Sequence, residues 1–171
     1  SFNKNNTIFI SINYRVNVFG FLAHPLLKQN KETELSCNIA VLDIIKAIKW
    51  IKEYIHNFGG DPNRITLFGQ SAGSLLSSCL SVIEDGKGLF NNVIFQSGIG
   101  YKAPALDCIS LEKALKNGEE FFKPFEVKSV EDMRNIKVID LLNRFKELMN
   151  IKKELIFSPA IDGKIILKSF T

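Results

Sequence analysis

Hydrophobic and polar positions follow two different spacings along the first hundred residues. Residues 7–12 form a short run rich in β-branched and aromatic side chains, which predicts a buried strand. From Ile39 onward, apolar residues recur at three- and four-residue steps, as on one face of a long helix. These positions are Val41, Ile44, Ile45, Ile48, Ile51, Ile55 and Phe58. Gly59 and Gly60 predict the end of this helix, and residues 61–63 predict a turn.

Two further strands and a helix follow. Residues 65–68 and 92–96 predict the strands, and residues 72–82 predict the helix between them. All three strands are apolar throughout, which is typical of strands covered on both faces. The order β-α-β-α-β therefore predicts an α/β fold, with a mostly parallel sheet, right-handed crossovers and flanking helices.

The last third of the chain changes to a helical pattern. Residues 111–122 and 138–149 predict two helices, and Ser129 with Asp132 predicts the start of a short one between them. Residues 155–159 return to a strand-like composition before a turn at Asp162 and Gly163. Since no repeat or linker interrupts the pattern, we interpret residues 1–171 as part of one domain.

Composition excludes several classes of protein. Of the 171 residues, 46% are hydrophobic and 23% charged, which excludes a disordered or fibrous chain. The net charge of +4 is scattered, so nucleic acid is not predicted as a partner. The apolar runs are far shorter than the ~18–20 residues of a membrane span. Cys37, Cys79 and Cys108 show no C-x-x-C spacing, so neither a disulfide framework nor a metal site is predicted.

The ends of the chain also carry information. It begins at Ser1 without a leader and stops directly after an apolar stretch. We interpret it as a segment of a longer protein, and the sequence leaves both the compartment and the oligomeric state open.

Residues 69–73 carry the candidate chemistry. They read Gly69-Gln70-Ser71-Ala72-Gly73 and fit Gly-x-Ser-x-Gly, the nucleophile elbow, between a predicted strand and a predicted helix. The two glycines would let strand and helix approach closely at a strained turn. Ser71 would be the nucleophile, and the Ala72 N–H would stabilise the oxyanion that forms on attack at a carbonyl. The alternative is a packing turn of small residues without catalysis.

Other stretches carry a wider resemblance. Residues 12–22 are similar to NYRLGVFGFL, residues 38–50 to GNYGLLDQIAALKWV, and residues 58–73 to FGGDPxxVTLFGESAG. Residues 89–90, 95–98 and 159–163 match later landmarks, and residues 101–154 match least. The chain thus resembles the type B carboxylesterases, the family of cholinesterases and para-nitrobenzyl esterases.

The resemblance implies an α/β-hydrolase fold, no cofactor, a small-molecule ester substrate and a Ser/Glu/His triad. Ser71 matches the nucleophile, and Ala72 matches one oxyanion donor. The other oxyanion donors would precede Ser1, and the triad Glu and His would follow Thr171. Gln70 stands where the family has Glu, which removes a carboxylate near the site and puts its electrostatic role in doubt. Cys37, Ala40 and Ile44 depart at loop-packing positions.

The other candidate residues have plainer interpretations. His56 would lie one strand length, about 15 Å, from Ser71 and is expected to be a surface residue. His24 follows a strand on the same side as Ser71, so geometry leaves it open as a base, although the resemblance gives it no role. Ser97 also ends a strand, and we interpret it as a hydrogen-bonded loop residue.

Three hypotheses of function remain. The first is a serine carboxylesterase that works through an acyl-enzyme, of which this chain is the central part. The second is a cholinesterase-like binding or adhesion domain that keeps the fold without hydrolysis, although such relatives typically lack the nucleophile. The third is an inactive piece of a disrupted esterase. We expect the 171 residues alone to show no turnover and to expose sheet edges and apolar surface.

Overall fold

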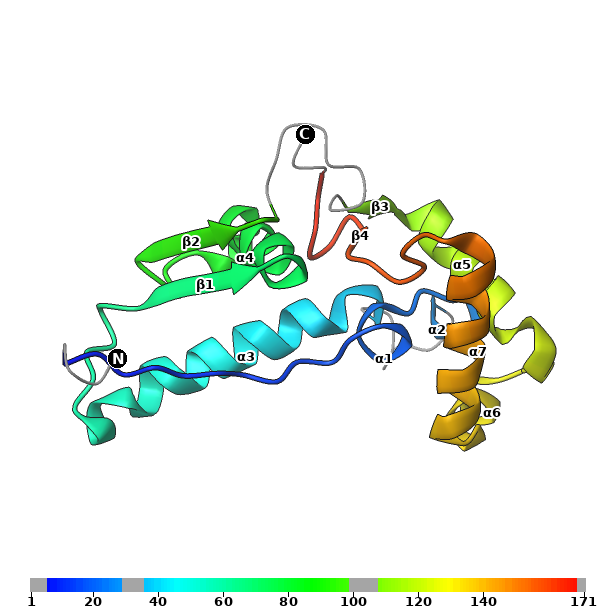
Figure 1. The fold of residues 1–171 in the computed structure, drawn as a ribbon, viewed down its shortest axis with the longest axis horizontal. Coiled ribbons are helices and arrows are strands. Elements are labelled where there is room, and N and C mark those ends of the chain that lie inside the picture. The colour runs from blue at the N-terminus through cyan, green and yellow to red at the C-terminus, as the bar shows by residue number, and fades with distance from the viewer. Residues whose placement is uncertain (1–5, 29–35, 99–107, 169–171) are drawn as a thin grey trace. The chain divides into compact units, whose positions relative to one another are not determined.

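A computed structural model describes residues 6–28, 36–98 and 108–168. The chain divides into two compact units, each made of two separate stretches of sequence. The first unit combines residues 1–14 with 41–102, and the second combines residues 15–40 with 103–171. Figure 1 shows the order of the elements along the chain.

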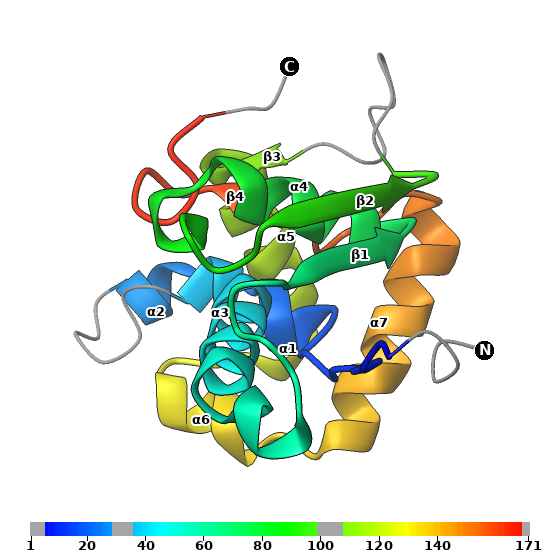
Figure 2. The ribbon, with the colours of Figure 1, turned by 90° about the vertical axis from the view of Figure 1, so that its left-hand side faces the viewer.

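A two-stranded parallel sheet forms the centre of the first unit. Strands β1 (Thr66–Gln70) and β2 (Asn92–Gln96) pair in register from Thr66 opposite Asn92 to Gln70 opposite Gln96. Helix α4 (Ala72–Val82) and the short η4 (Glu84–Gly86) connect the strands, and α4 packs against both of them (Figure 2). The predicted β-α-β order and the parallel pairing are confirmed here.

The long predicted helix is also present. Helix α3 (Ile39–Tyr54) continues as a 3₁₀ turn, η3 (Ile55–Phe58). Five of the seven predicted positions are buried, namely Val41, Ile44, Ile45, Ile48 and Ile55, whereas Ile51 is half-buried and Phe58 is exposed. Gly59 ends it with φ 78°, a left-handed conformation in which its N–H donates to the His56 carbonyl. In the following turn, Asp61 Oδ1 accepts from the Asn63 N–H at 2.8 Å.

The first predicted strand is wrong. Residues 7–12 take no place in a sheet within the described part of the chain, and Ile8 and Phe9 are 42% and 52% exposed. A strand needs a neighbour to complete its ladder of hydrogen bonds, and none of the described strands lies beside this segment in a ladder. The composition of residues 7–12 is typical of a strand, but whether a partner strand lies beside them depends on tertiary structure, which composition does not show.

Within the described residues, the two faces of this two-stranded sheet differ in burial. Alternate residues of β1 point to opposite faces, and the burial of the strand alternates in the same way. Gly69 belongs to the face that meets α4. Phe68 and its register partner Ile94 lie on the other face, and they are 44% and 50% exposed.

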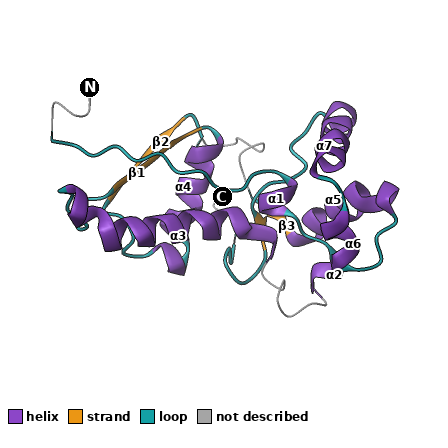
Figure 3. Ribbon diagram, turned by 90° about the horizontal axis from the view of Figure 1, so that it is seen from below, coloured by secondary structure: helices purple, strands orange, loops and turns teal. Residues whose placement is uncertain are grey.

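The second unit is mostly helical (Figure 3). Its described elements, in chain order, are α1 (Val18–Phe21), α2 (Pro25–Lys28), η2 (Ser36–Asn38), β3 (Ile109–Ser110), α5 (Leu111–Phe122), η6 (Lys123–Phe125), α6 (Val130–Asn135), α7 (Val138–Lys152) and β4 (Ala160–Ile161). The three helices predicted after residue 101 are confirmed as α5, α6 and α7. The strand predicted at residues 155–159 is wrong, because the strand begins at Ala160, where it pairs in parallel with β3.

Aromatic rings, small residues and aliphatic side chains such as Leu148, Ile156 and Ile166 make up the core of this unit. Phe121 is fully buried and meets Phe122 and Phe157 edge-on, with ring centroids 5.1 and 5.2 Å away. A neighbouring cluster contains Ala23, Cys37, Ala114 and Ala160. Within residues 19–22, Gly20 and Phe21 are buried, while Phe19 is 36% exposed.

One buried amide joins residues that are far apart in the sequence. Asn38 is completely buried, and its Nδ2 donates to the Ala160 carbonyl at 2.8 Å and to Asp162 Oδ2 at 2.9 Å. Its Oδ1 accepts from the Ala160 N–H at 3.0 Å. The second carboxylate oxygen of Asp162 accepts three backbone N–H groups, from Lys164, Ile165 and Ile166. The predicted turn at Asp162 is therefore confirmed, and Asn38 fixes it to the start of α3.

Among the described helices, none combines the length and apolar character that a membrane crossing requires.

Candidate functional site

Ser71 stands at a sharp bend between β1 and α4. It is the N-cap residue of α4, with φ 51° and ψ −116°, an uncommon backbone conformation for a residue other than glycine. Its N–H donates to the Gln96 carbonyl of β2 at 2.8 Å, which continues the sheet by one bond. Its side chain makes no capping bond to α4, and the residue is half-buried. The structure thus contains the strand-turn-helix context that the elbow motif requires.

The first turn of α4 supplies the backbone donors of this bend. The Ser71 carbonyl accepts from the N–H groups of Ser74, at 2.9 Å, and Leu75, at 3.1 Å. Helix geometry gives the Ala72 and Gly73 N–H groups no acceptor inside the helix, and neither donates to a backbone carbonyl in the described part of the chain. These two groups and the positive end of the helix dipole are available for a negatively charged atom.

The two glycines of the motif differ in their packing. A Cβ at Gly69 would lie 2.8 Å from the Ser74 nitrogen and closer still to the Gly73 carbonyl, so only glycine fits at this position. A Cβ at Gly73 would meet no atom within 4 Å among the described residues. The close approach of strand and helix therefore explains why residue 69 is glycine. At residue 73 the described structure leaves space for a side chain, and it is the backbone of Gly73 that approaches Gly69.

The neighbouring polar residues lie at the ends of the two strands. Gln70 is exposed and faces Gln96 across the sheet. Ser97 follows β2, is exposed and has φ 53°. Sequence reasoning gave no role to two residues beside the elbow: Ser74, which belongs to no motif, and Gly98, which ends the landmark at residues 95–98. Ser74 is fully buried, and a Cβ at Gly98 would collide with it.

The two histidines occupy different settings. His56 is exposed on η3, before β1 begins, as expected of a surface residue. His24 belongs to the second unit, is 8% exposed and meets Phe122 edge-on at 5.7 Å. Its Nδ1 accepts from the Leu26 N–H at 3.2 Å. Burial lowers the pKa of His24, and the charge of Glu119 opposes that effect.

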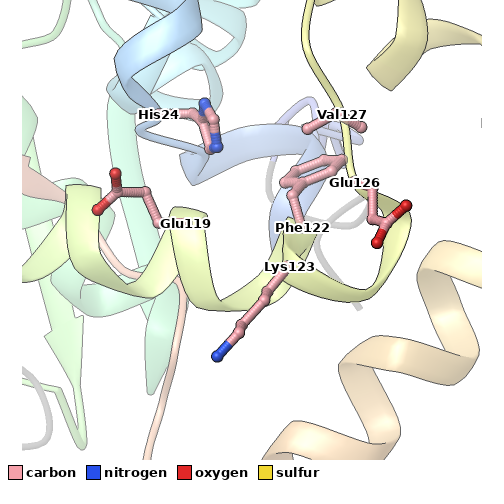
Figure 4. Close-up of a pocket in the computed structure, with 6 residues that line it drawn as sticks. All are labelled: His24, Glu119, Phe122, Lys123, Glu126 and Val127. Atoms are coloured by element: carbon pink, nitrogen blue, oxygen red, sulfur yellow. The ribbon is translucent and has the colours of Figure 1, made fainter.

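A shallow pocket surrounds His24 in the second unit. Figure 4 shows the residues that line it: His24, Glu119, Phe122, Lys123, Glu126 and Val127. Acidic and basic side chains are mixed, so the pocket favours no single charge on a ligand. Across the described residues, no group of three or more His, Cys, Asp or Glu side chains is arranged to hold a metal ion.

Comparison with known proteins decides the family. The profile described as the carboxylesterase family matches residues 1–170. The chain belongs to the carboxylesterase family. It is 32% identical over 169 residues to the para-nitrobenzyl esterase of Bacillus subtilis (strain 168), a match that covers 95% of this chain and 32% of that protein. It is also 30% identical over 165 residues to neuroligin-2 of Mus musculus, with 94% of this chain and 18% of that protein covered.

Solved structures agree with this family assignment. The crystal structure of a carboxylesterase from Geobacillus stearothermophilus superposes with a TM-score of 0.78 and 31% identity, covering 91% of this chain and 32% of that one. The fold class is therefore that of the α/β-hydrolase carboxylesterases, as the sequence predicted. The chain spans about a third of the length of these esterases.

Proposed function

We propose that this carboxylesterase-family chain carries the nucleophile of a carboxylic ester hydrolase, and that Ser71 is that nucleophile. The main support is the backbone at Ser71, where an uncommon conformation places a serine between the end of β1 and the first turn of α4. The surrounding structure maintains a strained turn here, and such turns concentrate at functional sites. The Ala72 N–H is the oxyanion donor of this proposal, and Gly69, Gln70 and Gly73 complete the elbow.

The proposed reaction has two stages. Ser71 Oγ bonds to the ester carbonyl carbon, its proton passes to a general base, and the carbonyl oxygen becomes an oxyanion beside the Ala72 N–H. Collapse of the oxyanion breaks the bond to the alcohol, which leaves with the proton from the base. Water then attacks the acyl-enzyme, the bond to Oγ breaks, a proton returns to Ser71 and the carboxylic acid departs.

The substrate class in this proposal is a small-molecule carboxylic ester, without a cofactor. Relatives named para-nitrobenzyl esterase and fumonisin B1 esterase fit that class, the latter at 39% identity over 94 residues. The general base is assigned to the part of the family's domain that this chain does not span. In this view residues 1–171 are one portion of a larger catalytic domain.

Covalent labelling of the full-length protein tests the proposal. A fluorophosphonate should label the folded wild type, peptide mapping should place the label on Ser71, and Ser71→Ala should abolish it. Label on another residue, or no label on a protein shown to be folded, overturns the proposal. Thermal unfolding of both proteins checks that the substitution leaves the fold intact.

A binding domain without hydrolysis is the second candidate, favoured by the similarity to neuroligin-2 and neuroligin-3. The presence of a serine between Gly69 and Gly73 favours the esterase. A folded full-length protein that turns over no p-nitrophenyl ester and takes no label would support the binding domain instead. The 171 residues by themselves are proposed to be inactive, and turnover by the pure chain that Ser71→Ala abolishes would redirect attention to His24.

A further inference from the structure

The turn that follows β2 packs directly against the nucleophile elbow. Gly98 is buried, and a Cβ there would lie 2.5 Å from the Ser71 carbonyl oxygen. The same Cβ would lie 2.6 Å from Ser74 Oγ and closer still to Ser74 Cβ. The first contact is with backbone and the last with a side-chain atom that no rotation can move away, so only glycine fits at residue 98.

The Ser71 carbonyl sets the direction of the candidate oxyanion donor. The carbonyl of Ser71 and the N–H of Ala72 belong to one planar peptide group, so a tilt of one moves the other. Hydrogen bonds from the Ser74 and Leu75 N–H groups hold the carbonyl on one side, and Gly98 limits it on another. An oxyanion donor acts only when it lies about 2.7–3.1 Å from the developing charge, so a small tilt is costly.

Two further observations indicate that the close approach is built into the site. Ser97 holds φ 53°, an uncommon conformation that brings the chain back toward α4. Ser74 Oγ is completely buried and has no hydrogen-bond partner in the described part of the chain. A buried hydroxyl without a partner is unfavourable, so the tight packing at Ser74 opposes stability at this point.

We propose that Gly98 is a positioning residue for the nucleophile elbow. Because Gly98 has no side chain, its backbone can pack against the Ser71 carbonyl without displacing it. This packing keeps the Ser71–Ala72 peptide, and with it the Ala72 N–H, in its orientation. Gly98 touches neither the substrate nor the reacting atoms. This inference rests on the proposed esterase function.

The test compares glycine-to-alanine substitutions in the full-length protein. Gly98→Ala should lower kcat for a p-nitrophenyl ester on the order of 100-fold, the loss typical of one oxyanion donor, with KM changed less than about twofold. The inhibition constant of a trifluoromethyl ketone, which forms a tetrahedral adduct with the serine, should rise by a similar factor. The matched control is Gly88→Ala, at an exposed turn with φ 69° beyond the other end of β2, where a Cβ meets no described atom within 4 Å.

A second variant keeps the test valid if Gly98→Ala fails to fold. Ser74→Gly combined with Gly98→Ala removes the Cβ contact at Ser74 and keeps the one with the Ser71 carbonyl, so kcat should fall relative to Ser74→Gly alone. Wild-type kcat in folded Gly98→Ala, or an equal loss in Gly88→Ala, overturns the inference.

A structural readout separates this inference from the proposed function. In protein labelled with ¹⁵N-alanine, the Ala72 amide signal should shift in Gly98→Ala and stay in place in Gly88→Ala. If the wild type hydrolyses no ester, the proposed function fails, and the amide signal alone decides whether Gly98 orients the peptide. An unchanged Ala72 signal in Gly98→Ala overturns the positioning role.

Discussion

Asn17 and Ser71 share a type of backbone conformation that glycine adopts most easily. Asn17 has φ 54° and ψ −139°, close to the values at Ser71. Such conformations cost of the order of 1–3 kcal/mol each. At Asn17 the side chain offsets part of this cost, because its Oδ1 accepts from the Val18 N–H at 2.6 Å and caps α1. At Ser71 no such bond exists, so the neighbouring residues must hold the conformation.

Substitution of Asn17 separates the cap from the strain. Asn17→Ala should lower the free energy of unfolding by about 1 kcal/mol, because it removes the cap and keeps the conformation. Asn17→Gly should be at least as stable as the wild type, since glycine relieves the strain and is only slightly poorer as a cap. Urea unfolding of the full-length protein measures both values. A glycine variant less stable than the alanine variant would contradict the prediction.

Asn38 allows a sharper comparison, because its amide both donates and accepts. Asn38→Ala should cost about 2–3 kcal/mol, since it leaves buried backbone groups of Ala160 without partners. Asn38→Asp should cost more, because it places a second carboxylate beside Asp162 Oδ2 and removes the donor. Urea unfolding at neutral pH compares the two. Equal stability of the two variants would show that Asp162 contributes little to the network.

His24 gives the second unit a pH dependence of defined sign. Burial lowers its pKa in the folded state below the ordinary value of 6.5, so the unfolded chain takes up the proton first on acidification. The neutral ring therefore contributes stability above about pH 6.5, which is lost as the pH falls toward the folded-state pKa. His24→Gln should flatten the decline in unfolding temperature between about pH 7.5 and 5. An unchanged slope in His24→Gln would contradict this assignment.

At the scale of elements, short helices depend on their ends. Helix α6 has six residues, and a capping box begins it: Ser129 Oγ accepts from the Asp132 N–H at 3.1 Å, and Asp132 Oδ2 accepts from the Ser129 N–H at 2.8 Å. Ser129→Ala should lower the free energy of unfolding by about 1 kcal/mol. Ser81→Ala is the matched control, because Ser81 lies in the last turn of α4, where its Oγ donates to the Ser77 carbonyl and caps no helix start. Urea unfolding should show little change for the control, and an equal cost in both would exclude a capping effect.

The helices and strands also show which elements can be predicted from the sequence pattern. Helices α3 and α5 were predicted well, because a helix satisfies its own backbone and shows its buried face as a period. The strands at residues 7–12 and 155–159 were predicted wrongly, because a strand exists only beside a partner. The four-residue helices α1 and α2 are too short to show a period.

The candidate site likewise has a part that the sequence predicts and a part that it does not. The motif around Ser71 could be recognised because its residues are adjacent in the sequence. The close contact between Ser74 and Gly98 was missed, since it depends on how α4 packs on β2 and leaves no trace in the spacing of residues. The sequence analysis explained both Gly69 and Gly73 by a close approach of strand and helix, but in the structure only Gly69 makes such an approach.

At the scale of the whole molecule, the uncovered face of β1 and β2 dominates the behaviour expected of the 171 residues. Phe68 and Ile94 occupy neighbouring positions on that face, and Phe9 meets the Phe68 ring at 5.8 Å. Exposed apolar patches of this kind promote association. The unpaired edges of a two-stranded sheet act in the same direction.

Substitution on that face tests the expectation. In the 171-residue chain, Ile94→Thr should reduce self-association, because threonine keeps strand preference and removes apolar surface. Val82→Thr is the control, at a residue 63% exposed at the end of α4. Light scattering over a range of concentrations measures the effect. Equal scattering from both variants would show that the sheet face is not the site of association.

The bonds between Asn38 and Ala160 also bear on the order in which the protein assembles during synthesis. All of the first unit has been made once residue 102 has left the ribosome, and its two stretches can then join. Asn38 must wait for a partner 122 positions further along the chain. At typical rates of translation, several seconds pass between the synthesis of residue 102 and that of Ala160, and during this time residues 15–40 lack their core partners and can bind a chaperone.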